Sequence, residues 1–158
     1  MPNVNLVCIG PAGSYRTGAE TNFFDLGFVS EQMKHDALAA CTCLCVPSIG
    51  ESFGLVYIEA GRYSKPVVAR RLPVLEELLE NGRAGLLVGT PGTKRNAVDI
   101  TAEELAANLH HLLNSPEECA RLGQNCRRVS DKFIWPEAVK RFEVAYQGAL
   151  GNGAAPAC

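Results

Sequence analysis

Continuous apolar runs recur along the first half of the chain, each ended by a turn or by charged residues. They lie at residues 4–10, 23–30, 41–48, 65–71 and 84–89. Runs of this kind, without regular polar alternation, are typical of strands that are buried on both faces of a parallel sheet. Helical spacing separates them at residues 30–40, 53–63 and 74–82. Because strands and helices alternate with short connections, the pattern predicts an α/β fold with a doubly wound, Rossmann-like parallel sheet.

Beyond residue 100 the pattern changes to helices alone. Capping boxes begin at Thr101 and Ser115 and predict two helix starts. A last amphipathic helix follows, and its apolar stripe comprises Val139, Phe142 and Tyr146. We therefore expect one domain over residues 1–149 with helices at its C-terminal end, and a disordered tail over residues 150–158.

Composition and charge narrow the classes of partner. The formal net charge is −2 and the basic residues are scattered among acidic ones, which does not favour nucleic-acid binding. No apolar run approaches the ~20 residues that span a bilayer, and no basic segment precedes the first apolar run. We expect a cytoplasmic protein with no transmembrane segment and no nucleic-acid partner.

The seven cysteines do not suggest a disulfide framework. Cys8 and the trio Cys41, Cys43 and Cys45 fall inside apolar runs, where they are predicted to be small buried side chains. No histidine or further cysteine lies beside them with the spacing of metal ligands. We therefore expect neither a metal nor a cofactor.

The segment PSIGESFGLVYIEAG, at residues 47–61, joins the third apolar run to the helix after it. In parallel α/β folds, ligands bind at the carboxyl ends of the strands. A helix that begins near Phe53 leaves its first amides without intrahelical partners. The backbone N–H groups of Ser52, Phe53, Gly54 and Leu55 can therefore bind an anion.

Two carboxylates, Glu51 and Glu59, stand eight residues apart in this segment. On a helix they would be spread over roughly 10 Å. That separation suits a diphosphate flanked by two rings with hydroxyl groups, which is the shape of a nucleotide-sugar. The spacing alone also allows Glu51 to be a helix-dipole partner and Glu59 to be a solvated residue of an amphipathic helix.

The motif PSxxESFGLxxxEA, followed by KPVVA and ENGRAGLLV, resembles the C-terminal, donor-binding domain of group 1 (family 4) retaining glycosyltransferases. The resemblance covers residues 5–88, with weaker agreement in RLGQNCRR and DKFIWPEAVKRF. It implies the C-terminal half of a GT-B fold. It also implies glycosyl transfer from a nucleoside-diphosphate sugar, of the UDP, GDP or ADP type.

Specific roles follow from the resemblance for residues in the motif. Glu51 would be the catalytic-site carboxylate that contacts hydroxyl groups of the transferred sugar. The backbone at Phe53, Gly54 and Leu55 would hold the diphosphate, beside the Ser52 amide, and Glu59 would accept hydrogen bonds from the ribose.

Further donor contacts are implied in the first 30 residues. The loop at Gly27, Phe28 and Val29 would lie beside the base, and Gly10 matches the glycine that closes the first strand in family members.

The sequence departs from the family pattern after Glu59. Gly61 stands where members usually have methionine, Arg62 where they have a small alanine and Ser64 where they have glycine. Pro73 and Val74 replace a pair of glycines. Helix packing near Gly61 is therefore expected to differ, and the loop after the fourth strand is expected to be reshaped.

Full-length members also carry an N-terminal acceptor-binding domain, and a first βα unit whose arginine and lysine neutralise the leaving diphosphate. The sequence begins after that unit, so we expect a fragment or a split subunit that needs an acceptor-domain partner. Charge stabilisation of a leaving group is a large catalytic term, and losing it should cost orders of magnitude in rate. Arg16 is the nearby basic candidate for a substitute, against the alternative of an ordinary surface arginine.

Two other functions stay open. The chain could be a non-catalytic binding or assembly module derived from such a domain, acting for example as a homodimer. A nucleotide-sugar epimerase of related fold is a third possibility. The sequence specifies neither the base, nor the sugar, nor the acceptor.

Overall fold

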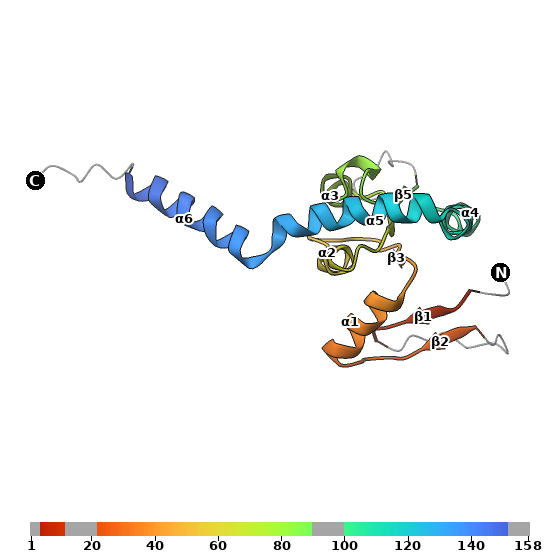
Figure 1. Cartoon of the computed structure of the whole chain (residues 1–158). Coiled ribbons are helices and arrows are strands. Elements are labelled where there is room, and N and C mark those ends of the chain that lie inside the picture. The colour runs from red at the N-terminus through yellow and green to blue at the C-terminus, as the bar shows by residue number, and fades with distance from the viewer. Residues whose placement is uncertain (1–3, 12–21, 90–99, 152–158) are drawn as a thin grey trace, which may run out of the picture. The chain divides into compact units, whose positions relative to one another are not determined.

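The computed structural model of the chain describes residues 4–11, 22–89 and 100–151 (Figure 1). Arg16, the candidate for a substitute cation, lies outside these residues. The chain divides into two compact units, residues 1–40 and residues 41–158. Each unit holds its own parallel sheet, in place of the single sheet that the sequence suggests. The mixed α/β class with parallel strands is confirmed.

Within residues 4–11 and 22–40, the first unit contains two strands and one helix. Strand β1 (Leu6–Cys8) pairs in parallel with β2 (Phe23–Asp25), and helix α1 (Glu31–Ala40) follows. The Ser30 hydroxyl accepts a hydrogen bond from the Met33 amide at 3.2 Å and thereby caps the start of α1.

The second unit is built on a three-stranded parallel sheet in the order β3-β4-β5. The strands are β3 (Leu44–Val46), β4 (Val67–Arg70) and β5 (Leu86–Val88). Cys45 pairs with Val68, and Val68 pairs with Leu86, so these side chains share one face of the sheet. The carboxyl ends of all three strands lie at one edge, which is where the segment that contains Glu51 begins.

Helices connect and flank these strands in the second unit, whereas the last helix extends away from the sheet (Figure 1). Their bounds are α2 (Leu55–Arg62), α3 (Pro73–Leu78), α4 (Ala102–Leu113), α5 (Pro116–Ser130) and α6 (Trp135–Gly151), with short 3-10 turns η1 (Glu80–Gly82) and η2 (Asp131–Phe133). The predicted helix over 74–82 is thus interrupted, because Glu80 and Asn81 adopt φ values of 52° and 55°, which a continuous helix does not allow.

The core of the second unit joins the sheet to the C-terminal helices. Val68 and Val88 pack with Leu112 of α4 and Leu122 of α5, all at most 1% exposed. Cys43 and Cys45 are among the half-buried side chains that pack against this cluster. The burial predicted for Cys8, Cys41, Cys43 and Cys45 is incomplete, since all four are half-buried.

Helices α2 and α5 pack closely because glycine removes a side chain from their interface (Figure 1). A β-carbon added at Gly61 would lie 2.6 Å from the carbonyl oxygen of Cys126. Next to this contact, the buried Ser130 hydroxyl donates to the Ile58 carbonyl at 2.8 Å. Gly61 replaces the methionine that family members usually have, and it stands where the backbones of the two helices nearly touch.

Helix α2 ends in a Schellman motif that has serine at the left-handed position. Ser64 has a φ of 56°. Its amide donates to Gly61 at 2.8 Å, and the Lys65 amide donates to Ala60 at 3.1 Å, the two hydrogen bonds that define the motif. The chain thus keeps a glycine-type helix end without glycine.

The apolar stripe predicted for the last helix lies on α6 and is largely exposed. Phe142 is 60% and Tyr146 68% exposed, while Val139 is half-buried. Helix α6 continues to Gly151, so the first two residues of the predicted tail are helical, and residues 152–158 lie outside the described part. None of the helices in the described ranges combines the length and apolar content needed to cross a bilayer.

Candidate functional site

The carboxylate of Glu51 lies in the turn between β3 and α2 and gathers backbone amides around itself. One of its oxygens, Oε1, accepts hydrogen bonds from the amides of Ser52, Phe53 and Gly54, at 3.0, 3.4 and 3.1 Å. Successive amides that point at one position form a concave anion-binding site. In this structure the bound anion is the side chain of the turn itself.

The turn owes its shape to Gly54. This residue has φ 90° and ψ 45°, a left-handed conformation that favours glycine, and α2 begins only at Leu55. The predicted helix start at Phe53 is thus two residues early. A β-carbon at Gly54 would also lie 2.7 Å from Cδ2 of Tyr57, so glycine is required by contact as well as by conformation.

Tyr57 holds the turn against the sheet. It is 1% exposed, and its hydroxyl donates to the carbonyl of Val46, the last residue of β3, at 2.9 Å. Burial raises the pKa of Tyr57 to about 12, and the nearby Glu51 carboxylate acts in the same direction. The hydroxyl therefore stays protonated and continues to donate at any physiological pH.

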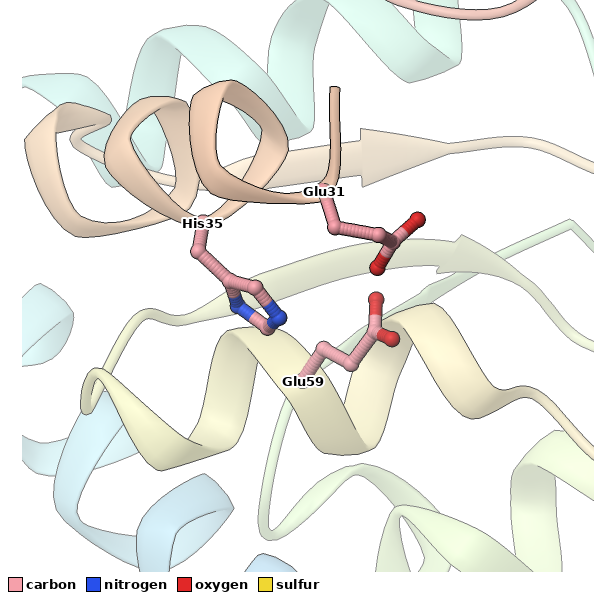
Figure 2. Close-up of side chains that lie close together, drawn as sticks. All are labelled: Glu31, His35 and Glu59. Carbon is pink, nitrogen blue, oxygen red and sulfur yellow. The ribbon is translucent and has the colours of Figure 1, made fainter. Parts of the chain in front are cut away.

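Glu59 is the fifth residue of α2, two residues after Tyr57, and Figure 2 shows its side chain leaving the helix. It is half-buried, flanked along the chain by the buried Ile58 and Ala60. In the first unit, Glu31 and His35 lie four residues apart on α1 and leave that helix on the same side (Figure 2). Lys34, which pairs with Glu31 at 2.8 Å, holds the pKa of the Glu31 carboxyl below its usual value.

Gly10 and the three residues predicted to lie beside the base, Gly27, Phe28 and Val29, are in the first unit. Gly10 and Gly27 come together at the ends of β1 and β2, where the Gly10 amide donates to the Gly27 carbonyl at 2.9 Å. Both have positive φ, and the Gly27 amide donates to a carboxylate oxygen of Asp25 at 3.1 Å. Phe28 is 83% exposed and Val29 is half-buried. The structure therefore brings two of the four together in one hydrogen-bonded turn.

Arg71 is a residue that the sequence pattern did not single out. Its guanidinium donates to the carbonyls of Gly89 at 3.0 Å and Leu87 at 3.2 Å, and pairs with Glu76 at 3.2 Å. The Gly89 amide in turn donates to Glu104 of α4 at 3.0 Å. Arg71 therefore fixes the carboxyl end of β5. The sequence does contain a signal that could have identified Arg71: it directly follows an apolar strand, and a glutamate stands five residues later.

The half-buried cysteines have the chemistry of neutral thiols. Burial raises the pKa of Cys43 to about 12 and that of Cys45 to about 11. In the absence of a bound metal these thiols are therefore protonated and are poor nucleophiles, because the thiolate is the nucleophilic form.

Two comparisons place the sequence among known proteins. The profile of the family described as glycosyl transferases group 1 matches residues 2–129. An uncharacterized glycosyltransferase of Methanocaldococcus jannaschii is 36% identical over 107 residues, which are 68% of this chain and 28% of that protein. The MMP alpha-(1->4)-mannosyltransferase of Mycolicibacterium hassiacum is 34% identical over 143 residues, or 87% of this chain and 33% of the relative. The chain thus spans about a quarter to a third of the length of these curated relatives.

Solved structures share the fold. The crystal structure of Anabaena Alr3699/HepE in complex with UDP and glucose superposes with a TM-score of 0.72 at 24% sequence identity. The match covers 92% of this chain and 41% of the Anabaena chain.

Proposed function

The chain belongs to the group 1 glycosyl transferases, and we propose that it is the part of such an enzyme that binds the nucleotide-sugar donor. The turn before α2 is the observation that carries this proposal. Three amides there already converge on a carboxylate oxygen, so their positions and orientations suit an anion. In the proposed complex this anion is the diphosphate of the donor.

The two carboxylates of the motif then have separate roles. Glu51 accepts hydrogen bonds from hydroxyl groups of the transferred sugar, and Glu59 accepts them from the ribose. When the bond between the sugar and the diphosphate breaks, negative charge grows on the leaving diphosphate. The amides of Phe53, Gly54 and Leu55 and the positive end of α2 stabilise that charge. Transfer with retention, by attack on the sugar face next to the diphosphate, is part of the proposal.

The nucleotide is proposed to be UDP in the first instance, because a solved structure with the same fold is a complex with UDP. GDP and ADP are the alternatives. The roles of Gly27, Phe28 and Val29 beside the base and of Gly10 in donor binding, the lack of a metal and a cytoplasmic location stay predictions.

The acceptor is proposed to bind outside the residues described above. The curated relatives are three to four times longer than the stretch they share with this chain. We infer that the working enzyme includes a further acceptor-binding domain, in the same polypeptide or in a partner subunit.

A second candidate function is a non-catalytic assembly module. Its supporting observation is the exposed apolar surface on α6, where Trp135 is 77%, Phe142 60% and Tyr146 68% exposed. Contiguous exposed apolar side chains favour association with a partner or with a second copy.

Calorimetric titration with UDP, GDP and ADP separates the two candidates. We expect one of the three to bind the wild-type chain, and Glu59→Ala to weaken that binding about tenfold, because hydrogen bonds to a charged group are worth about 1.5–3 kcal/mol. Glu103→Ala, the same change at an exposed position on α4, is the control and should bind as the wild type does.

The opposite results are equally informative. Binding that Glu59→Ala leaves unchanged would remove Glu59 from the site. Failure of all three nucleotides to bind would end the donor-site proposal and leave the assembly module.

A further inference from the structure

The anion site before α2 is already filled by the chain's own Glu51. Oxygen Oε1 of this carboxylate takes the amides of Ser52, Phe53 and Gly54, at distances between 3.0 and 3.4 Å. These are three of the four amides that the donor's diphosphate would use. Two anions cannot share the same donors, because each needs the same N–H groups and like charges at such distances repel each other.

We propose that Glu51 is an internal competitor of the diphosphate, and that this competition makes the site select the intact nucleotide-sugar over the free nucleoside diphosphate. The inference rests on the proposed function, since it takes the turn before α2 to be the diphosphate site. It adds a second role to the sugar-binding carboxylate, namely setting which form of the nucleotide the site prefers.

The selection follows from what the carboxylate gains after it leaves the turn. Any diphosphate that binds must expel Glu51 from its three amides. With an intact donor, the expelled carboxylate finds new hydrogen bonds to the hydroxyl groups of the sugar. With a free nucleoside diphosphate it finds only water. The intact donor therefore replaces the hydrogen bonds that Glu51 loses, whereas the free nucleoside diphosphate does not.

The turn is built so that the side chain can leave while the amides stay in place. Tyr57 ties the turn to the end of β3 through its hydrogen bond to Val46, and its ring lies directly under Gly54. Only the side-chain torsions of Glu51 need to change. The amides remain ordered for the incoming anion, which keeps the entropic cost of binding low.

Removing the competitor should therefore tighten the binding of small anions. We expect Glu51→Ala to bind inorganic pyrophosphate and UDP about tenfold more tightly than the wild type, since charge-assisted hydrogen bonds no longer have to be broken first. Glu51→Gln keeps a capping oxygen without its charge and should show a smaller gain. In both variants the advantage of UDP-glucose over UDP should shrink.

The experiment is calorimetric titration of the full 158-residue chain with pyrophosphate, UDP and UDP-glucose. It compares the wild type with Glu51→Ala, Glu51→Gln and Glu59→Ala, and includes Glu117→Ala, an exposed residue at the start of α5, as the matched control. Thermal unfolding of each variant verifies that it is folded, because the Glu51 side chain makes three hydrogen bonds within the turn before α2. Glu51→Gln, which can still cap the turn, keeps the test decisive if Glu51→Ala does not fold.

The outcomes separate this inference from the proposed function. If UDP binds the wild type, weakens in Glu59→Ala and does not tighten in either Glu51 variant, internal competition is wrong while the donor site stands. If no variant binds UDP or pyrophosphate, the diphosphate site itself is wrong, and the competition is refuted with it. Tighter UDP binding in the Glu51 variants, with unchanged binding in Glu117→Ala, supports the competition.

Discussion

Ser64 carries a cost that glycine would not. Its φ of 56° is left-handed, a conformation that costs a residue with a β-carbon roughly 1–2 kcal/mol. The side chain is exposed, so little packing is lost by removing it. We expect Ser64→Gly to raise the free energy of unfolding by about 0.5–1 kcal/mol, the gain from relieved strain being partly offset by the greater freedom of glycine in the unfolded chain.

Chemical denaturation of the wild type and Ser64→Gly measures this difference. Ser64→Ala is the control. It keeps the β-carbon, and with it the strain, so its free energy of unfolding should not rise. A Ser64→Gly variant that is less stable than the wild type would contradict the predicted relief of strain.

Individual residues were predictable where the signal is local. The Thr101 hydroxyl accepts from the Glu104 amide at 3.1 Å, as its capping box predicts. Ser115, with the same motif, makes no side-chain capping hydrogen bond, and its φ of −127° and ψ of 78° place it outside the usual geometry. Local spacing selected Glu51 as a site residue, but its partners depend on the left-handed Gly54, which no spacing rule specifies.

Among the elements, the contact between α2 and α5 is the one most sensitive to a single methyl group. A β-carbon at Gly61 would meet the Cys126 carbonyl oxygen at 2.6 Å and Cβ of Ser130 at 2.9 Å. Backbone atoms cannot rotate away as a side chain can, so the helices must move apart. We expect Gly61→Ala to lower the free energy of unfolding by about 2–3 kcal/mol.

Gly148 provides the matched control on α6. A β-carbon there would have no heavy atom within 4 Å. Gly148→Ala should therefore be neutral or stabilise the helix by up to about 1 kcal/mol, the difference in helix propensity between the two residues. Both variants are compared with the wild type by chemical denaturation. A Gly61→Ala variant as stable as Gly148→Ala would mean that α2 and α5 are not as close as described.

The elements themselves were predictable in kind and order, but not in extent. Apolar runs placed the five strands found in the described part of the chain, yet each strand spans only three or four residues. The expected burial of the runs holds for β4, whereas in the first unit it is wrong, since Leu6 of β1 is 54% and Phe24 of β2 is 45% exposed. The interruption after α3 was missed because Glu80 and Asn81 adopt left-handed conformations that are uncommon for residues other than glycine.

At the scale of the whole molecule, the sequence motif said more about the function of the chain than the fold did. The alternation of strands and helices predicts a parallel α/β protein, and many unrelated functions use that architecture. The Glu51 and Glu59 motif, after the third strand, points to one family, and the family profile agrees over residues 2–129. Neither the pattern nor the fold specifies the acceptor, because its binding is proposed to need a further domain.

The central claim is that the turn from Glu51 to Leu55 binds the diphosphate of a nucleotide, and backbone amide NMR tests it most directly. At 17.0 kDa the chain suits a titration with UDP that follows each amide separately. We predict that the resonances of Ser52, Phe53, Gly54 and Leu55 shift most, as the Glu51 carboxylate gives way to phosphate oxygens, while the Gly148 amide of α6 does not move. Shifts confined to other segments, or none at saturating UDP, would contradict the account.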